Sequence, residues 1–164
     1  MTTMTEKRLA WLQPSATSRT WELRSPDGVI GLLKFPSWLR FEAIGQIAGR
    51  SWHLTRKGFL TSKIEVHDPT TDDPIAEYIE RFPGGSGSVI LKTGQRLECS
   101  NNFLLTEWRL LDSGNHTLIR IHHAGGFLHT SAEVQLGSSP LLDANPWLVL
   151  TGWYLLMLKH GDSA

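Results

Sequence analysis

Short segments in which apolar and polar residues alternate fill most of the chain between residues 20 and 136. Thr20–Arg24 is the clearest of them, because Trp and Leu alternate with Glu and Arg, as in a half-buried strand. Turn signals separate the segments, beginning with Ser25–Gly28, where Pro fixes φ and Gly supplies a positive φ. Turn signals at intervals of about 8–12 residues predict an all-β barrel or sandwich built largely from hairpins.

The last apolar segment has a different pattern. Residues 147–158 are apolar all round a helix apart from Thr151, and such a helix must be enclosed on every side. Asn145 suits an N-cap, Pro146 suits the first helical position, and a Lys-His-Gly stop follows, so we predict a helix over 146–159. It would be about 21 Å long, short of the roughly 30 Å hydrocarbon core of a bilayer, so protein rather than lipid should enclose it.

The predicted helix accounts for much of the expected core. Thr151 and Gly152 can be interpreted in two ways. In the first, the Thr hydroxyl donates to the carbonyl one turn back, and Gly lets the surrounding wall approach the helix closely; in the second, neither residue has a specific role. The side chains expected to be buried are Trp147, Leu148, Leu150, Trp153, Tyr154, Leu155 and Leu158.

A closed sheet is the natural container for a helix without a polar face, because it has no edge strands and presents side chains inward all round. We therefore predict a mainly β fold, a closed antiparallel β-barrel wrapped around a central hydrophobic C-terminal helix. Residues 1–18 are expected to be an N-terminal extension, in which only Leu9–Leu12 can dock. Residues 19–160 are expected to form one domain.

These features resemble the tubby-like C-terminal fold of Tubby proteins, phospholipid scramblases and LURP-one-related proteins. The resemblance is carried by the hairpins from Thr20 to Leu136 and by the closing segment Pro146–Leu158. It implies an antiparallel barrel of about 12 strands around a C-terminal helix. It also implies lipid-related activities, but the cysteine cluster of scramblases is missing, and no phosphoinositide-binding residue of Tubby proteins can be matched.

Composition narrows the choice of partners. The 164 residues carry 16 Lys+Arg against 16 Asp+Glu, so no overall field favours nucleic acid or an anionic membrane. Cys99 is the only cysteine, and the first ten residues contain no apolar stretch typical of a secretory signal. We expect a cytoplasmic protein, peripheral to a membrane at most, that is not transmembrane and needs no cofactor.

The local charge pattern suggests one binding site. Arg50, Arg56, Lys57 and Lys63 fall in one strand-turn-strand stretch that contains no acidic residue. Cations at a hairpin tip can bind phosphate groups or acidic lipid headgroups, at about 1 kcal/mol each beside an anionic surface. The alternative is that these cations pair with the acidic residues that follow, from Glu65 to Glu80.

Histidines suggest a weaker possibility. His122 and His129 flank a Gly-Gly turn, so adjacent strands could bring two imidazoles together as metal ligands. No carboxylate or thiol stands at ligand spacing, and surface histidines are the alternative reading.

Three classes of function stay open. The first is a non-catalytic binding module for acidic lipid headgroups or phosphorylated ligands at a membrane surface. The second is a protein-interaction barrel, including a homodimer, that uses exposed apolar residues of the N-terminal extension; scramblase-like activity is a further alternative. An enzyme is not expected, because no acid-base or nucleophile arrangement is readable in the sequence.

Overall fold

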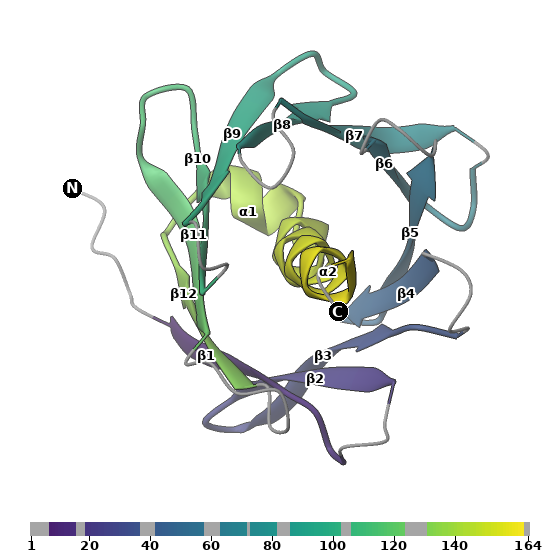
Figure 1. The fold of residues 1–164 in the computed structure, drawn as a ribbon, viewed down its shortest axis with the longest axis vertical. Coiled ribbons are helices and arrows are strands. Elements are labelled where there is room, and N and C mark those ends of the chain that lie inside the picture. The colour runs from purple at the N-terminus through teal and green to yellow at the C-terminus, as the bar shows by residue number, and fades with distance from the viewer. Residues whose placement is uncertain are drawn as a thin grey trace.

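The computed structural model describes residues 7–15, 19–36, 42–57, 63–71, 73–81, 86–102, 106–123 and 131–162. Twelve antiparallel strands form one closed barrel, and two helices follow them (Figure 1). The strands are β1 Lys7–Leu12, β2 Thr20–Ser25, β3 Gly28–Lys34, β4 Glu42–Ile47, β5 Arg50–Lys57, β6 Lys63–His67, β7 Pro74–Glu80, β8 Gly87–Leu91, β9 Arg96–Asn101, β10 Glu107–Leu111, β11 Thr117–His123 and β12 Ser131–Leu136. The helices are α1 Pro140–Ala144 and α2 Trp147–Asp162. The predicted fold class is therefore confirmed.

Strand order follows chain order almost all the way round the barrel. Each strand from β2 to β11 pairs with the next one along the chain, as expected of a series of hairpins. The sheet is closed by β1, which pairs antiparallel with β12 on one side and with β2 on the other. No strand of the barrel is left as an open edge.

The first strand corrects the expectation that residues 1–18 lie outside the barrel. Leu9 and Trp11 point inward and are buried, and Trp11 stacks on Trp153 of α2 with ring centroids 6.0 Å apart. Because these side chains are buried, they cannot be the exposed apolar surface that the sequence analysis assigned to the N-terminal segment.

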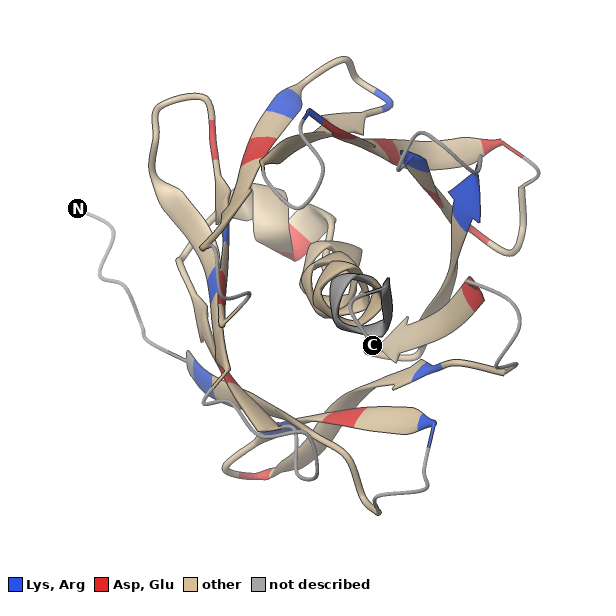
Figure 2. Ribbon diagram, viewed as in Figure 1, with Lys and Arg blue, Asp and Glu red and all other residues tan. Residues whose placement is uncertain are grey.

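The helix α2 occupies the middle of the barrel (Figure 1). Six of the seven side chains predicted for its core are buried, and Leu158 near its end is half-buried against the same core. Figure 2 shows charged residues on the strands of the wall, whereas the part of the α2 ribbon that is coloured by residue type carries none. Charged residues thus lie on the wall, where water can solvate them, and the apolar helix lies in the interior, away from water.

Two small residues fit the helix to its wall. The Thr151 hydroxyl donates to the Trp147 carbonyl at 3.0 Å, so this buried polar group has the partner predicted for it. A Cβ added to Gly152 would lie 2.6 Å from Cζ3 of Trp108 on β10, which no relaxed contact allows. Of the two readings of these residues, the one in which the Thr151 hydroxyl is bonded and Gly152 allows close approach of the wall is therefore confirmed.

The start of the helix differs from the prediction. The helix begins at Trp147, and Asn145 caps the C-terminal end of α1, where its side-chain amide and backbone N–H both donate to the Leu141 carbonyl. The short helix α1 was not predicted, and its own N-cap is Ser139, whose hydroxyl accepts from the Leu141 N–H.

Candidate functional site

The four cations proposed from the sequence do not form one site. Arg50 begins β5 and Arg56 lies near its end, so about 20 Å of strand separates them at about 3.3 Å per residue. The Arg50 guanidinium lies over the Trp52 ring, 4.9 Å from its centroid. Arg50 therefore lies at the opposite end of the barrel from the other three cations.

The other three cations have separate surroundings. Lys57 and Lys63 face each other across β5 and β6, and Lys63 Nζ lies 3.4 Å from Glu77 Oε1, as the ion-pairing alternative predicted. Arg56 follows Trp52 and Leu54 on the inner face of β5, close enough to Tyr154 to affect its pKa. Burial raises the pKa of Tyr154, Arg56 opposes this and Glu42 adds to it.

A more compact group of charges lies on the outer face of β10 and β11. The Glu107 carboxylate accepts from Nε of Arg109 at 2.6 Å, and from Nε and Nη2 of Arg120 at 3.1 and 3.3 Å. Nδ1 of His122 lies 4.0 Å from the same carboxylate. The mostly buried carboxylate of Glu107 thus holds two guanidinium groups side by side.

The register of the sheet explains this arrangement. Glu107 faces His122, and Arg109 faces Arg120, across the β10–β11 pair. Side chains on one face of an antiparallel pair contact both direct and diagonal partners. Glu107 therefore reaches Arg109 along its own strand and Arg120 diagonally across the pair.

The pKa of Glu107 reflects these contacts. Burial alone would raise the pKa, but the hydrogen bonds and charges of Arg109 and Arg120 together outweigh it and lower the pKa below its ordinary value. Glu107 is therefore ionised at neutral pH, and both guanidinium groups stay fixed against it.

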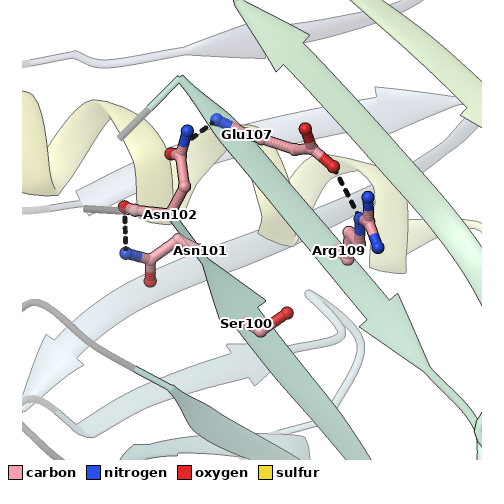
Figure 3. A pocket seen from close by; sticks show the side chains of 5 residues that line it. All are labelled: Ser100, Asn101, Asn102, Glu107 and Arg109. Atoms are coloured by element: carbon pink, nitrogen blue, oxygen red, sulfur yellow. Dashed lines mark hydrogen bonds and ion pairs between the residues drawn. The ribbon is translucent and has the colours of Figure 1, made fainter. Parts of the chain in front are cut away.

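A hollow of about 290 Å³ adjoins this group (Figure 3). Its lining consists of Ser100, Asn101, Asn102, Glu107 and Arg109. Every one of these side chains can donate or accept a hydrogen bond, and Arg109 is the cation among them. The hollow is therefore suited to a small polar or anionic group rather than to an apolar one.

The polar wall of the hollow is held by the β9–β10 connection. Oδ1 of Asn102 accepts from the backbone N–H groups of Thr106 and Glu107 at 2.8 and 3.0 Å. The Asn101 side-chain amide donates to the Asn102 carbonyl at 3.2 Å (Figure 3). These bonds fix the start of β10, and with it the position of Glu107.

The charged group continues across neighbouring strands. Register places Arg8 of β1, Gln135 of β12, Arg120, Arg109 and Ser100 of β9 in one row on the outer face. Within the described residues Arg8 has no ion pair, and Arg109 bonds through Nε alone, which leaves its terminal nitrogens available. We call Arg8, Arg109 and Arg120 the arginine row.

The histidine hypothesis gains no support from the part of the chain that the structure describes. His122 lies on the outer face beside Glu107, and His129 falls outside the described residues. Among the described residues no three His, Cys, Asp or Glu side chains are grouped as metal ligands would be.

The arginine row was missed in the sequence because its members are distant along the chain. A weak signal exists: Glu107 and Arg109 flank Trp108, an alternation that predicts an inward Trp and two outward charges. That prediction is confirmed, since Trp108 is buried. The pairing of Arg109 with Arg120, however, depends on a register that no local pattern specifies.

Within the described residues, none of the helices has both the length and the apolar character needed to cross a bilayer.

Comparison with known proteins adds a likeness of fold. The chain is similar to an X-ray structure of a protein from Arabidopsis thaliana, with a TM-score of 0.56 and 10% sequence identity, over 89% of this chain and 91% of the other. The likeness of fold extends over most of both chains. No protein-family model matches the chain, and no curated protein matches its sequence. At this identity the likeness shows the fold alone.

Proposed function

We propose that the protein is a non-catalytic binding module for ligands that carry phosphate, and that it binds them at the arginine row and the adjoining hollow. The observation that carries the proposal is the pair of guanidinium groups fixed by Glu107 at the edge of a polar hollow. Guanidinium groups bind phosphate through parallel N–H donors and are favoured wherever such planar recognition matters.

The pairing with Glu107 supports binding as well as structure. Glu107 bonds Nε of Arg109 and so fixes the plane of its guanidinium, and among the described residues the terminal nitrogens of Arg109 take no part in an ion pair. A guanidinium that is already oriented loses less conformational entropy when a phosphate binds. Ser100 and the two Asn residues supply further polar contacts from the wall of the hollow.

The source of the phosphate is a lipid headgroup in this proposal. The overall charge is balanced, so attraction to an anionic membrane must come from a local group of cations. The arginine row carries three positive charges and Glu107 one negative charge, so a net of about two charges would add about 1 kcal/mol each beside an anionic surface. We place the protein in the cytoplasm, at the periphery of a membrane and not within it.

Vesicle sedimentation tests the proposal. We expect the protein to bind phosphatidylcholine vesicles that contain a phosphoinositide, to lose binding as salt rises, and to be displaced by soluble inositol phosphate. Arg109→Ala should weaken binding by at least about tenfold, since a charge-assisted contact of about 1.4 kcal/mol or more is lost. Binding of soluble inositol phosphate without vesicle binding would assign the site to a free ligand instead.

Arg24→Ala is a closely matched control. Arg24 bonds Glu22 two residues away at 2.7 Å and is 46% exposed, and Arg109 bonds Glu107 in the same way at 2.6 Å and is 47% exposed. The control residue lies on β2 opposite Ala10 of β1, and it is neither a member of the arginine row nor part of the lining of the hollow. Equal losses in the two variants, or no binding by the wild type at low salt, would contradict the proposed site.

The combined variant Arg56→Ala and Lys57→Ala tests the hairpin that the sequence suggested. We expect vesicle binding to be retained, because these cations face different sides of β5. A larger loss of vesicle binding than in Arg109→Ala would show that the hairpin, and not the arginine row, is the binding site.

A protein-interaction barrel is the second candidate. The observation in its favour is a group of exposed apolar side chains on β3 and β4. Scramblase-like activity has no comparable support in the part of the chain that the structure describes.

A further inference from the structure

His122 lies beside the arginine row on the outer face of the barrel. Register places it on β11 directly opposite Glu107 of β10 on one side and Glu133 of β12 on the other. Its Nδ1 atom is 4.0 Å from Oε2 of Glu107, and its side chain is 49% exposed, so water reaches the ring. A titratable imidazole therefore stands between two carboxylates, next to the surface assigned above to phosphate.

The Glu107 carboxylate can accept a proton-bearing imidazole without releasing Arg109. Its Oε1 atom accepts from Nε of both Arg109 and Arg120, at 2.6 and 3.1 Å. Its Oε2 atom accepts from Arg120 at a longer 3.3 Å, and this is the oxygen that faces His122. The two ring states of His122 therefore leave in place the bond that orients Arg109.

The charges that surround His122 balance when its ring is neutral. Within the described residues, those that face it directly or diagonally are Glu107 and Arg109 of β10, Arg120 of its own strand, and Glu133 of β12. Two carboxylates there oppose two guanidinium groups, and Arg8 of β1 adds a third guanidinium beyond β12. A positive charge at His122 would cancel that of Glu133 and so restore the excess that the arginine row has over Glu107.

We propose that protonation of His122 regulates the phosphate site, so that binding strengthens as the pH falls from about 7.5 to about 5.5. This inference rests on the function proposed above and adds the condition under which binding is strongest. Histidine is the side chain whose charge ordinarily changes between about pH 5 and 8, whereas carboxylates and guanidinium groups keep theirs. The lowered pKa of Glu107 moves its own change of charge further from this range.

The charge on His122 acts on the phosphate across a short distance and not by contact. The hollow lies on the other side of β10, where Ser100 of β9 contributes to its lining. Two strand spacings of about 4.8 Å separate β11 from β9, which is comparable to the Debye length of about 10 Å in 0.1 M salt. One added charge beside an anionic surface should strengthen binding about fivefold.

Sedimentation with the same phosphoinositide vesicles, at about pH 7.5 and about pH 5.5, tests the proposal. The measured quantity is the affinity of the wild type divided by that of His122→Gln, because any change in the charge of the lipid affects both proteins alike. We expect this ratio to be close to one at the higher pH and about five at the lower pH. His122→Lys, which is charged at both pH values, should bind about fivefold more tightly than His122→Gln at both.

His53→Gln is the matched control. Nε2 of His53 lies 3.7 Å from Oε2 of Glu42 and its side chain is 40% exposed, so His53 resembles His122 in partner and in exposure. It lies on β5, outside the arginine row. We expect this variant to bind as the wild type does at both pH values. Equal losses at low pH in His53→Gln and His122→Gln would overturn the proposal.

The outcomes separate this inference from the function on which it rests. If the wild type binds at both pH values but its ratio to His122→Gln stays the same, regulation by His122 is wrong and the arginine row remains the site. If the wild type binds at neither pH, the proposed function fails and the regulation fails with it.

Glu133→Gln tests the charge balance independently. It should raise the affinity about fivefold at the higher pH, because it removes the charge that protonated His122 would cancel. An unchanged affinity in this variant would contradict the balance of charges from which the regulation is inferred.

Discussion

At the scale of the residue, Glu107 determines the character of the outer face of β10 and β11. Its carboxylate holds Arg109 and Arg120 together, so two like charges stand side by side without net repulsion. The same contact lowers the pKa of Glu107 against the opposing effect of burial. The free energy of unfolding therefore depends on the ionisation of this one group.

Glu107→Gln should make part of the stability independent of pH. A lowered pKa in the folded state stabilises the protein above the unfolded pKa, near 4.5, and this stabilisation is lost as pH falls through the folded value. We expect the variant to lose about 1 kcal/mol of unfolding free energy at pH 7 and much less at pH 3, since the two arginines are partly exposed.

Urea denaturation at the two pH values measures this difference. Glu22→Gln is a suitable control, because in the described part of the chain Glu22 forms an ion pair with one arginine, Arg24, where Glu107 forms ion pairs with two. If the unfolding free energies of Glu107→Gln and the wild type differ by the same amount at pH 7 and pH 3, ionisation of Glu107 is not the source of the pH-dependent stabilisation.

Single residues also mark the limit of what could be predicted from the sequence. Thr151 and Gly152 could be interpreted because their roles depend on the helix itself. In a helix enclosed on all sides a polar side chain needs a hydrogen-bond partner within the helix, and a small residue allows the wall to pack closely. The turn at Ala48 and Gly49 was missed, because Ala48 has a φ of 53° that favours Asn or Gly, and its side chain gives no turn signal.

At the scale of the element, β1 is the main departure from the sequence analysis. The strand pairs with β12, whose residues lie more than 100 positions further along the chain. Its apolar pattern is also blurred, since Ala10 and Leu12 on the other face are apolar too. A strand with weak alternation and a distant partner cannot be distinguished by local pattern from a docked extension.

Trp11→Ala tests whether β1 is part of the wall. Trp11 is fully buried and stacks on Trp153, so its removal leaves a large cavity between the wall and α2. We expect a loss of about 3–5 kcal/mol in the free energy of unfolding. Urea denaturation followed by far-UV circular dichroism measures it, and a loss below about 1 kcal/mol would mean that β1 is dispensable.

The elements that were predicted correctly share one property: their signals are local. The hairpins alternate and end in recognisable turns, and α2 is apolar all round. The arginine row is different, because a register across several strands brings its members together. Register follows from how the whole barrel closes around the helix, and no short pattern contains it.

At the scale of the whole molecule, the barrel and α2 are one cooperative structure. Removing the helix would leave a barrel lined by apolar side chains and filled with water, and opening the barrel would expose an entirely apolar helix. Neither part can be stable alone. The proposed binding surface depends on this cooperative structure, because closure of the sheet through β1 and β12 places Arg8 in the arginine row.

Native-state hydrogen exchange tests that claim most directly. We expect the backbone amides of residues 149–158 in α2 and those of β1 to exchange only through global unfolding, with the same free energy as the central strands. Rapid exchange of the α2 amides while the strands stay protected would contradict the account, since it would show a helix that leaves an intact barrel.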